Sequence, residues 1–173
     1  GLALIPEDRQ RTGLALGLPL SFNLTSANLP ALSPWGFIRG ALERRVSADY
    51  IRKLRIRADG PAQLAARLSG GTQQKLVIAK WLFRQARVFL FDEPTRGIDV
   101  GAKVEVFQLM DELARAGAAI LMVSSEMPEL MQVADRILVM RRGRLTAELP
   151  QGATQEEIMR RATLEAFAEE QSA

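Results

Sequence analysis

The chain contains neither cysteine nor histidine. Without cysteine it forms no disulfide and no cysteine-ligated zinc site. Without histidine, no imidazole is available as a general base, a metal ligand or a phosphate sensor. Long apolar runs are missing too, because runs such as residues 116–123 fall far short of the roughly 20 residues that a membrane-spanning helix needs. No charged-then-apolar leader begins the sequence, so a cytosolic protein is the default expectation.

The composition is that of an ordinary soluble globular protein. The 173 residues are 47% hydrophobic and 25% charged, which suits one domain with a sizeable core. The net charge of +3 comes from basic residues that are dispersed along the chain. This pattern favours a solvated surface over a nucleic-acid footprint, so no nucleic-acid partner is expected.

Alternating apolar runs and helical patterns predict an α/β fold with a mostly parallel sheet. We expect buried strands at residues 2–6, 88–91 and 118–123, the second of them buried on both faces, and a charged loop at 7–13. Helices are expected at 37–42, 48–54, 69–85, 102–116 and 126–133, followed by a hairpin of 136–140 with 144–149 and a last helix capped by Thr154.

The segment Ser69-Gly70-Gly71 precedes a helical pattern and suits phosphate binding. Glycines let backbone amides approach a phosphate closely, and a helix that begins there adds free N–H groups and the positive end of its dipole. Ser69 adds a hydroxyl donor. A plain helix N-cap is the alternative, because serine is a favoured capping residue.

Two adjacent carboxylates, Asp92 and Glu93, follow the apolar run at 88–91. Parallel α/β sheets place their ligands at the carboxyl ends of strands. There Asp92 suits Mg²⁺, held through water, and Glu93 suits polarising an attacking water. The alternative is a charged pair where a strand exits to solvent.

These two motifs, in this order and about one helix apart, resemble the signature and Walker B motifs of an ATP-binding cassette (ABC) ATPase. More narrowly, the chain resembles the C-terminal part of the second cassette in the tandem-cassette ATPase subunits of monosaccharide importers, of the ribose, galactose, xylose, arabinose and autoinducer-2 type. Four stretches carry the narrower match: Ile5-Pro6-Glu7-Asp8-Arg9, residues 68–75, residues 92–102, and residues 123–129.

The resemblance implies a P-loop NTPase-like fold with an α-helical subdomain at about 13–85, a RecA-like core at about 86–150 and a C-terminal helix at 151–173. In that family two cassettes meet head to tail, and the signature of one covers the ATP held by the other. The implied nucleotide contacts are Ser69, Gly70, Gly71, Thr72, Gln73, the D-loop residue Asp99, and Glu7 at the Q-loop position. Glu93 and Ser125, at the switch-histidine position, are the implied catalytic residues.

The implied role is an ATP-hydrolysing subunit that couples ATP, with Mg²⁺, to sugar uptake. Its implied partners are a second cassette in the same or another chain, membrane permease subunits and, indirectly, a periplasmic sugar-binding protein. The implied location is peripheral, on the cytoplasmic face of the inner membrane.

Three departures from the family pattern stand out. The phosphate loop GxxxxGK(S/T), or Walker A, is absent from the sequence, which contains no Gly-Lys dipeptide. That loop holds the β- and γ-phosphates, so we expect weak ATP binding and no hydrolysis by this chain alone. Glu7 replaces the Q-loop glutamine, as in the sugar-importer subfamily. Ser125 replaces the switch histidine and is a poor proton relay. Thr72 is a minor variation.

Truncation is the expected reason for the missing Walker A region, because the chain starts with Gly1 at the strand that normally follows it. The missing strands and helix would leave sheet edges and apolar faces uncovered, so we expect self-association. Two other functions stay open. One is a degenerate cassette that acts as a scaffold or regulatory module. The other, disfavoured by the lack of heptads, is a DNA-repair or chromosome-maintenance ATPase.

Overall fold

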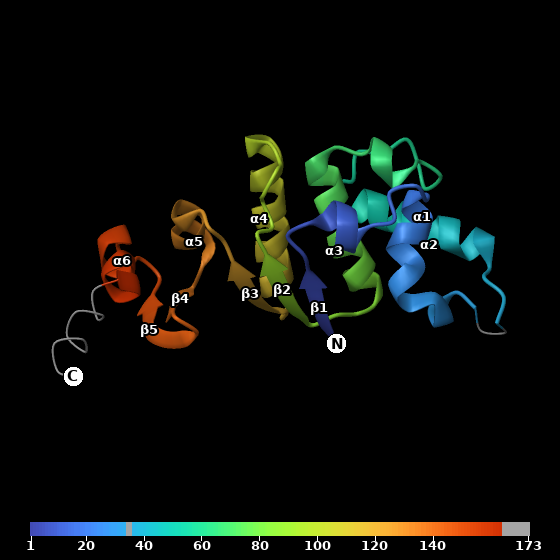
Figure 1. Ribbon diagram of the computed structural model, residues 1–173. Coiled ribbons are helices and arrows are strands. Elements are labelled where there is room, and N and C mark those ends of the chain that lie inside the picture. Colours follow the sequence, from blue (N-terminus) through green and yellow to red (C-terminus); the bar gives the residue numbers. More distant parts are fainter. Residues whose placement is uncertain (34–35, 164–173) are drawn as a thin grey trace. The chain divides into compact units, whose positions relative to one another are not determined.

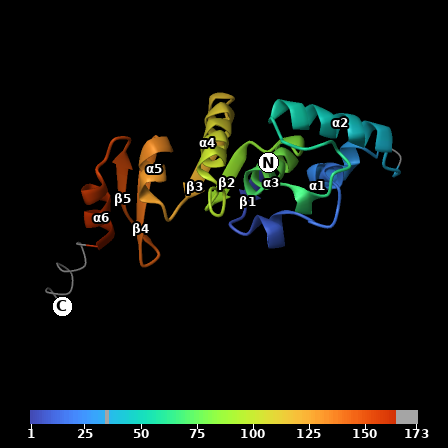
Figure 2. The ribbon, with the colours of Figure 1, turned by 90° about the horizontal axis from the view of Figure 1, so that it is seen from above.

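The computed structural model describes residues 1–33 and 36–163. The chain forms two compact units, Gly1–Val123 and Ser124–Ala173. The expected division into a helical subdomain, a RecA-like core and a C-terminal helix stays a prediction. Figures 1 and 2 show the elements of both units.

A three-stranded parallel sheet lies in the first unit. Its strands are β1 (Leu2–Ile5), β2 (Val88–Asp92) and β3 (Ala119–Val123), with β2 in the centre. Ile5 is in register with Phe91, and Asp92 with Val123, so all three strands end at the same edge. The predicted strands and the predicted parallel sheet are confirmed.

Only one face of this sheet is buried. Alternate residues of β1 and β2, among them Ile5, Phe89 and Phe91, are at most 1% exposed. On the other face, Leu4 is 51% and Leu121 51% exposed, and they flank the half-buried Leu90 in register. The prediction that the strand at 88–91 is buried on both faces was therefore wrong: its apolar run is continuous, but no described element of the first unit covers the second face.

Two helices cover the buried face. Helix α3 (Gly70–Phe83) runs through the core, and four successive residues, Leu76, Val77, Ile78 and Ala79, are fully buried. Burial on every side explains why the helix carries an unbroken apolar run at these four positions. Helix α4 (Val100–Arg115) is amphipathic and packs against α3 and β3. Its start precedes the predicted one by two residues.

The buried stripe of α4 consists of Val106, Leu109, Met110 and Leu113. Phe107 is half-buried beside this stripe, and Ala114 is exposed. After the helix, Gly117 has a φ of 90°, the left-handed conformation that commonly ends a helix.

The remaining elements of the first unit are helical: η1 (Arg9–Gly13), α1 (Leu20–Thr25), η2 (Ser26–Ala31), α2 (Gly40–Lys53) and η3 (Ala65–Arg67). The first is a π-helical turn in which Asp8 accepts from two backbone amides, so the predicted charged loop was wrong. The two helices predicted at 37–42 and 48–54 are one helix, α2, which begins after the exposed Phe37 and Ile38.

The second unit contains α5 (Met127–Val133), a hairpin of β4 (Arg136–Arg141) with β5 (Arg144–Pro150), and α6 (Gln155–Thr163). Arg142 and Gly143 have φ of 47° and 78°, the positive values of a two-residue type I′ turn. The predicted hairpin is thus confirmed. Thr154 Oγ1 accepts from the amide of Glu157 at 3.2 Å, which confirms the predicted cap.

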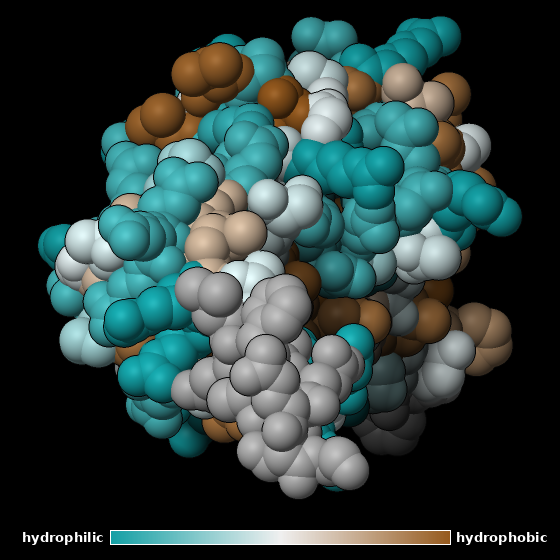
Figure 3. Space-filling view, turned by 60° about the vertical axis from the view of Figure 1, so that its left-hand side comes forward, coloured by the Kyte–Doolittle hydropathy of each residue, from teal (hydrophilic) through white to brown (hydrophobic). Residues whose placement is uncertain are grey.

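The surface carries both polar and apolar residues. Figure 3 shows hydrophobic residues (brown) gathered in patches between hydrophilic ones (teal) on the face that it presents. None of the helices in the described part of the chain has the length and apolarity that crossing a bilayer requires.

Candidate functional site

The start of helix α3 presents hydroxyl and amide groups together. Ser69 caps the helix, because its Oγ accepts from the backbone amide of Thr72 at 3.4 Å. The Ser69 Oγ also donates to Thr72 Oγ1 at 2.9 Å. No acidic residue occupies the first turn, so the positive end of the helix dipole is not offset by this helix's own side chains. The structure thus shows the capping role that was the alternative for Ser69, and the phosphate-binding role stays a prediction.

The start of helix α4 lies against the start of α3. Asp99 caps α4 by accepting from the amide of Ala102 at 2.9 Å. A Cβ added to Gly71 would lie 2.3 Å from the Cβ of Ala102, far inside van der Waals contact. Gly71 is therefore required by the close approach of two helices, a reason beyond the phosphate approach expected from the sequence. Two helix N-termini meet here.

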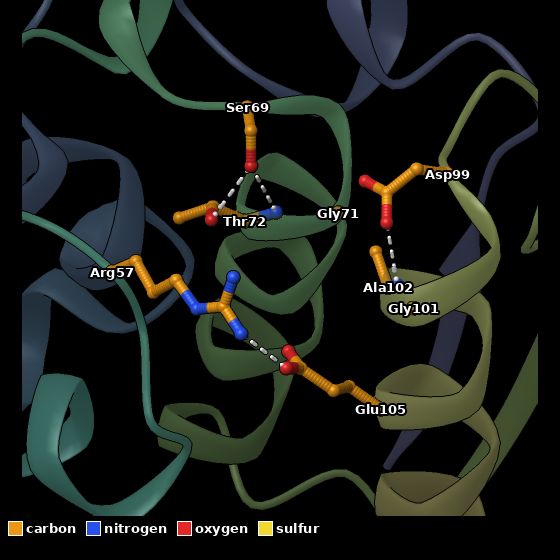
Figure 4. Close-up of a pocket in the computed structure, with 8 residues that line it drawn as sticks. All are labelled: Arg57, Ser69, Gly71, Thr72, Asp99, Gly101, Ala102 and Glu105. Atoms are coloured by element: carbon orange, nitrogen blue, oxygen red, sulfur yellow. Dashed lines mark hydrogen bonds and ion pairs between the residues drawn. The ribbon is translucent and has the colours of Figure 1, made fainter.

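Between them lies a small pocket of about 80 Å³, which we call the α3–α4 pocket. Figure 4 shows the residues that line it: Arg57, Ser69, Gly71, Thr72, Asp99, Gly101, Ala102 and Glu105. The pocket brings together four residues that the sequence singled out, Ser69, Gly71, Thr72 and Asp99. Chemically, it offers hydroxyls, helix N-termini and one guanidinium, which suit an oxyanion, beside the carboxylates of Asp99 and Glu105, which are already paired or capping.

Two charged residues of this pocket, Arg57 and Glu105, were missed by the sequence analysis. Arg57 Nη2 lies 2.6 Å from Glu105 Oε1, and the buried Lys75 Nζ lies 2.8 Å from Glu105 Oε2. The hydrogen bond from Lys75, together with the positive charges of Lys75 and Arg57, lowers the pKa of Glu105 below its ordinary value. Partial desolvation and the negative charge of Asp99 act in the opposite direction but do not cancel this shift. Lys75 stood inside the signature match, but no local pattern pointed to the other two.

The segment that follows β1 is tied to the turn after β2. Glu7 pairs with Arg96. The buried Arg9 donates from Nη1 to the carbonyl of Arg96 at 2.9 Å and from Nη2 to that of Gly97 at 3.2 Å. Burial lowers the pKa of Arg9, and the nearby Asp8 opposes that shift. These residues line a second, open hollow of about 500 Å³, which contains the predicted contact Glu7.

Gly70 and Gln73 connect α3 to this segment. A Cβ on Gly70 would lie 2.7 Å from Nη2 of Arg9 and 2.9 Å from the carbonyl of Gly97, so glycine permits this packing. The side chain of Gln73 is buried, with only 2% of the residue exposed. Its Nε2 donates to the carbonyl of Ala65 at 3.1 Å, and its Oε1 accepts from Nε2 of Gln10 at 3.1 Å. A nucleotide contact by Gln73, as expected from the sequence, requires its side chain to leave these partners.

The carboxylates predicted to act on magnesium and water follow β2. Asp92 is the last residue of the strand and is half-buried. Glu93 donates its amide to the carbonyl of Val123 at 2.9 Å and accepts at its own carbonyl from Arg96 at 3.1 Å. Its φ of 46° lies in the left-handed region, which is uncommon for a residue other than glycine. Residues with such backbone strain cluster at functional sites, so this conformation supports Glu93 as a candidate functional residue.

Among the described residues, no group of three or more histidine, cysteine, aspartate or glutamate side chains could hold a metal. Asp92 nevertheless fits Mg²⁺ by chemistry, because this ion is commonly bound by one or two carboxylates together with phosphate oxygens and water. Ser125 belongs to the second unit, where neighbouring Ser124 donates to Glu129 at 3.3 Å. The catalytic role of Ser125 stays a prediction.

Comparison with known proteins identifies close relatives. The family model described as "ABC transporter" matches residues 23–96. The chain is 51% identical over 166 residues to a Burkholderia ambifaria protein named as a ribose/galactose/methyl galactoside import ATP-binding protein, covering 94% of this chain and 32% of the relative. It is 47% identical to the ribose import ATP-binding protein RbsA of Geobacillus kaustophilus, covering 94% and 33%. The chain thus spans about a third of the length of these curated relatives.

Solved structures of ATP-binding cassettes share the fold. One is a dimeric cassette in a post-hydrolysis state bound to ADP and Pi, with a TM-score of 0.68, 19% identity, and coverage of 88% of this chain and 64% of the other. Another is a cassette of an ABC transporter in its ADP conformation, with a TM-score of 0.66, 20% identity, and coverage of 92% and 63%. At such identities the likeness establishes the P-loop NTPase type of fold.

Proposed function

The chain belongs to the ABC transporter family of ATP-binding proteins, and we propose that it forms the signature-bearing part of a cassette that powers monosaccharide import. The names of its relatives support a ribose- or galactose-type sugar as the cargo. In this role a second cassette, in the same or another chain, holds with its Walker A loop the ATP that the signature of this chain covers. Membrane permease subunits and a periplasmic sugar-binding protein complete the importer, with this chain peripheral on the cytoplasmic face.

The observation that carries this proposal is the meeting of two helix N-termini in the α3–α4 pocket. Ser69 and Thr72 offer hydroxyls, and the first turn of α3 offers backbone N–H groups. Phosphate oxygens of an ATP held by the facing cassette are the ligand that such a set favours. Gly71 lets the start of α4 approach these hydroxyl and N–H groups closely, and Asp99 caps α4 at that point.

The edge where β2 ends has a different role in the proposed reaction. Asp92 would hold Mg²⁺ there through a water molecule, and the ion would neutralise negative charge on the phosphates. Glu93 orients the attacking water and accepts its proton. The bond from its amide to the carbonyl of Val123 fixes its backbone at the end of β3. Glu7, on the segment after β1, contacts the nucleotide or its water.

Sugar transport then follows from a shift between two states. ATP binds the closed pair of cassettes better than the open pair, so ATP closes the pair and hydrolysis opens it again. The permease follows this motion. Because the sequence has no GxxxxGK(S/T) loop, this chain by itself hydrolyses no ATP under the proposal.

The experiment is to measure ATP turnover and ATP-driven sugar uptake by the importer that contains this chain, reconstituted in vesicles. Glu93→Gln keeps the shape of the side chain and removes the general base, so both rates should fall by about 100-fold or more. Glu112→Gln, an exposed glutamate on α4, serves as the matched control and should change neither rate. Full activity of the Glu93→Gln importer would reject the proposed role.

One feature favours a second candidate, a cassette that binds ATP without useful turnover and acts as a scaffold or regulator. Ser125 stands where the family has its switch histidine, and the sequence contains no histidine to replace it. A hydroxyl is a poor proton relay at neutral pH. Under this alternative, uptake would survive Glu93→Gln, whereas disruption of the pocket at Ser69 would abolish it.

A further inference from the structure

Arg57 reaches the α3–α4 pocket from the loop that follows α2 and belongs to none of the motifs singled out in the sequence. Figure 4 shows its guanidinium beside Ser69 and Thr72, with a dashed line to Glu105. Guanidinium carries five N–H donors in a planar fork, and one of them is engaged with Glu105 at 2.6 Å. Further donors can therefore meet an acceptor that enters the pocket.

Glu105 is itself held in place from the core side. Its second carboxylate oxygen lies 2.8 Å from Nζ of Lys75, whose side chain is only 7% exposed. Lys75 also donates to the carbonyl of Arg55 at 3.3 Å, so its position is fixed by two bonds. The row Lys75–Glu105–Arg57 thus begins at a buried cation and ends at an exposed one, so the buried end sets the position of the carboxylate that Arg57 contacts.

The charges of this row also suit an anion. Lys75 balances the carboxylate of Glu105, which leaves the charge of Arg57 available to a ligand. The other carboxylate at the pocket, Asp99, accepts from the amide of Ala102 at the start of α4, where the positive end of the helix dipole offsets it. A phosphate beside Ser69 would therefore meet a cation without facing an uncompensated carboxylate.

We propose that Arg57, aimed by Glu105, is an additional phosphate-binding residue of the α3–α4 pocket. It binds oxygens of the triphosphate of a nucleotide whose terminal phosphate lies at Ser69, and so it rests on the function proposed above. Arginine suits this task because its planar fork matches two oxygens at once. Lysine in its place keeps the charge but loses that geometry.

The test titrates ATP into the complex of the ¹⁵N-labelled 173-residue chain with the cassette that faces it, at constant ionic strength, and follows the backbone amide signals of residues 69–72. Three variants are compared with the wild type: Arg57→Ala, Arg57→Lys and Arg52→Ala. Arg52 is the matched control, because it is an exposed arginine paired with an acidic residue, Asp49, outside the pocket. Thermal unfolding of each variant is recorded alongside.

ATP should shift the signals of residues 69–72 in the wild type. Arg57→Ala should raise the dissociation constant for ATP by about five- to tenfold. Arg57→Lys should raise it by less, and Arg52→Ala should leave it unchanged. The unfolding temperatures should stay close together, since an exposed ion pair stabilises a fold by little. A purely structural pair would leave the affinity for ATP unchanged.

Two results overturn the inference, and only the second also overturns the proposed nucleotide site at Ser69. If ATP shifts residues 69–72 equally well in Arg57→Ala and in the wild type, Arg57 is no phosphate ligand, while the pocket keeps its proposed role. If saturating ATP leaves these signals unmoved in the wild type, the inference and the proposed nucleotide site at Ser69 both fail.

Discussion

Gly71 and Ala102 bring the first turns of α3 and α4 into direct contact, because a Cβ on Gly71 would lie 2.3 Å from the Cβ of Ala102. We expect Gly71→Ala to lower the free energy of unfolding by about 1–3 kcal/mol through overpacking. Urea unfolding measures this change. Gly101→Ala, at the start of α4, is the control, since the atom nearest to its added Cβ would be Oδ1 of Asp99 at 3.4 Å.

The same contact predicts a compensation. Ala102→Gly removes the methyl group that Gly71→Ala would strike, so the double variant should recover much of the lost stability. Equal instability of the single and double variants would show that the strain at Gly71 has another source.

Arg9 links the segment after β1 to the turn after β2 through its bonds to the carbonyls of Arg96 and Gly97. Arg9→Ala removes both donors, and we expect a loss of about 1–2 kcal/mol together with faster amide hydrogen exchange in residues 93–97. Arg11→Ala, an exposed arginine in the same helical turn, should change neither. Unchanged exchange in the Arg9 variant would remove the claim that this residue orders the turn.

Glu105 predicts a dependence of stability on pH. Its pKa is lowered in the folded chain, chiefly by the hydrogen bond from Lys75 and further by the positive charges of Lys75 and Arg57. Desolvation and the charge of Asp99 raise the pKa by less. A lowered folded pKa contributes stability above the ordinary value of 4.5, and that contribution is lost as the pH falls through the folded pKa.

Urea midpoints at pH 7, 4.5 and 3 measure this contribution. Wild type should be more stable than Glu105→Gln at pH 7, and the difference should shrink toward pH 3. Glu112→Gln, which changes an exposed residue of the same helix, controls for the general effect of removing a carboxylate. A difference that stays constant from pH 7 to pH 3 would contradict the assignment.

The uncovered sheet face predicts self-association of the chain. Leu4 and Leu121 lie on that face in register with Leu90, and each is 51% exposed. We expect sedimentation at high protein concentration to show species larger than a monomer. Leu4→Thr with Leu121→Thr keeps strand propensity and should restore the monomer.

Leu145→Thr is the control for this substitution, because Leu145 is 58% exposed on β5 in the other unit. It should leave the association unchanged. A wild-type chain that sediments only as a monomer would remove the idea that this face is adhesive.

Local patterns predicted the elements whose signals are strong. Helix α3 follows a serine cap and an apolar stretch, and the hairpin turns at Arg142-Gly143, so both were predicted correctly. Helix α1 spans only six residues, too few for a periodic pattern, and was missed. The apolar residues Phe37 and Ile38 were assigned to a helix although they are exposed outside it.

The parts that could not be predicted depend on contacts between distant residues. Arg57 and Glu105 are 48 residues apart, and nothing in either local sequence indicates that they pair. The burial of one sheet face depends on which element packs on it, and an apolar run such as that of β2 does not specify this. By contrast, Ser69 and Asp99 were identified from their motifs, and the structure brings them to one pocket.

The most direct test of the central claim, that the start of α3 acts on the phosphate of a nucleotide, is ATP turnover by the importer with Ser69→Asp and Ser69→Asn. Both substitutions keep a good helix cap, so both chains should fold as the wild type does. Aspartate adds a negative charge where the phosphate would lie and should lower turnover by about 100-fold or more, whereas asparagine should cost at most about tenfold. Turnover by the Ser69→Asp importer at the wild-type rate would contradict the account.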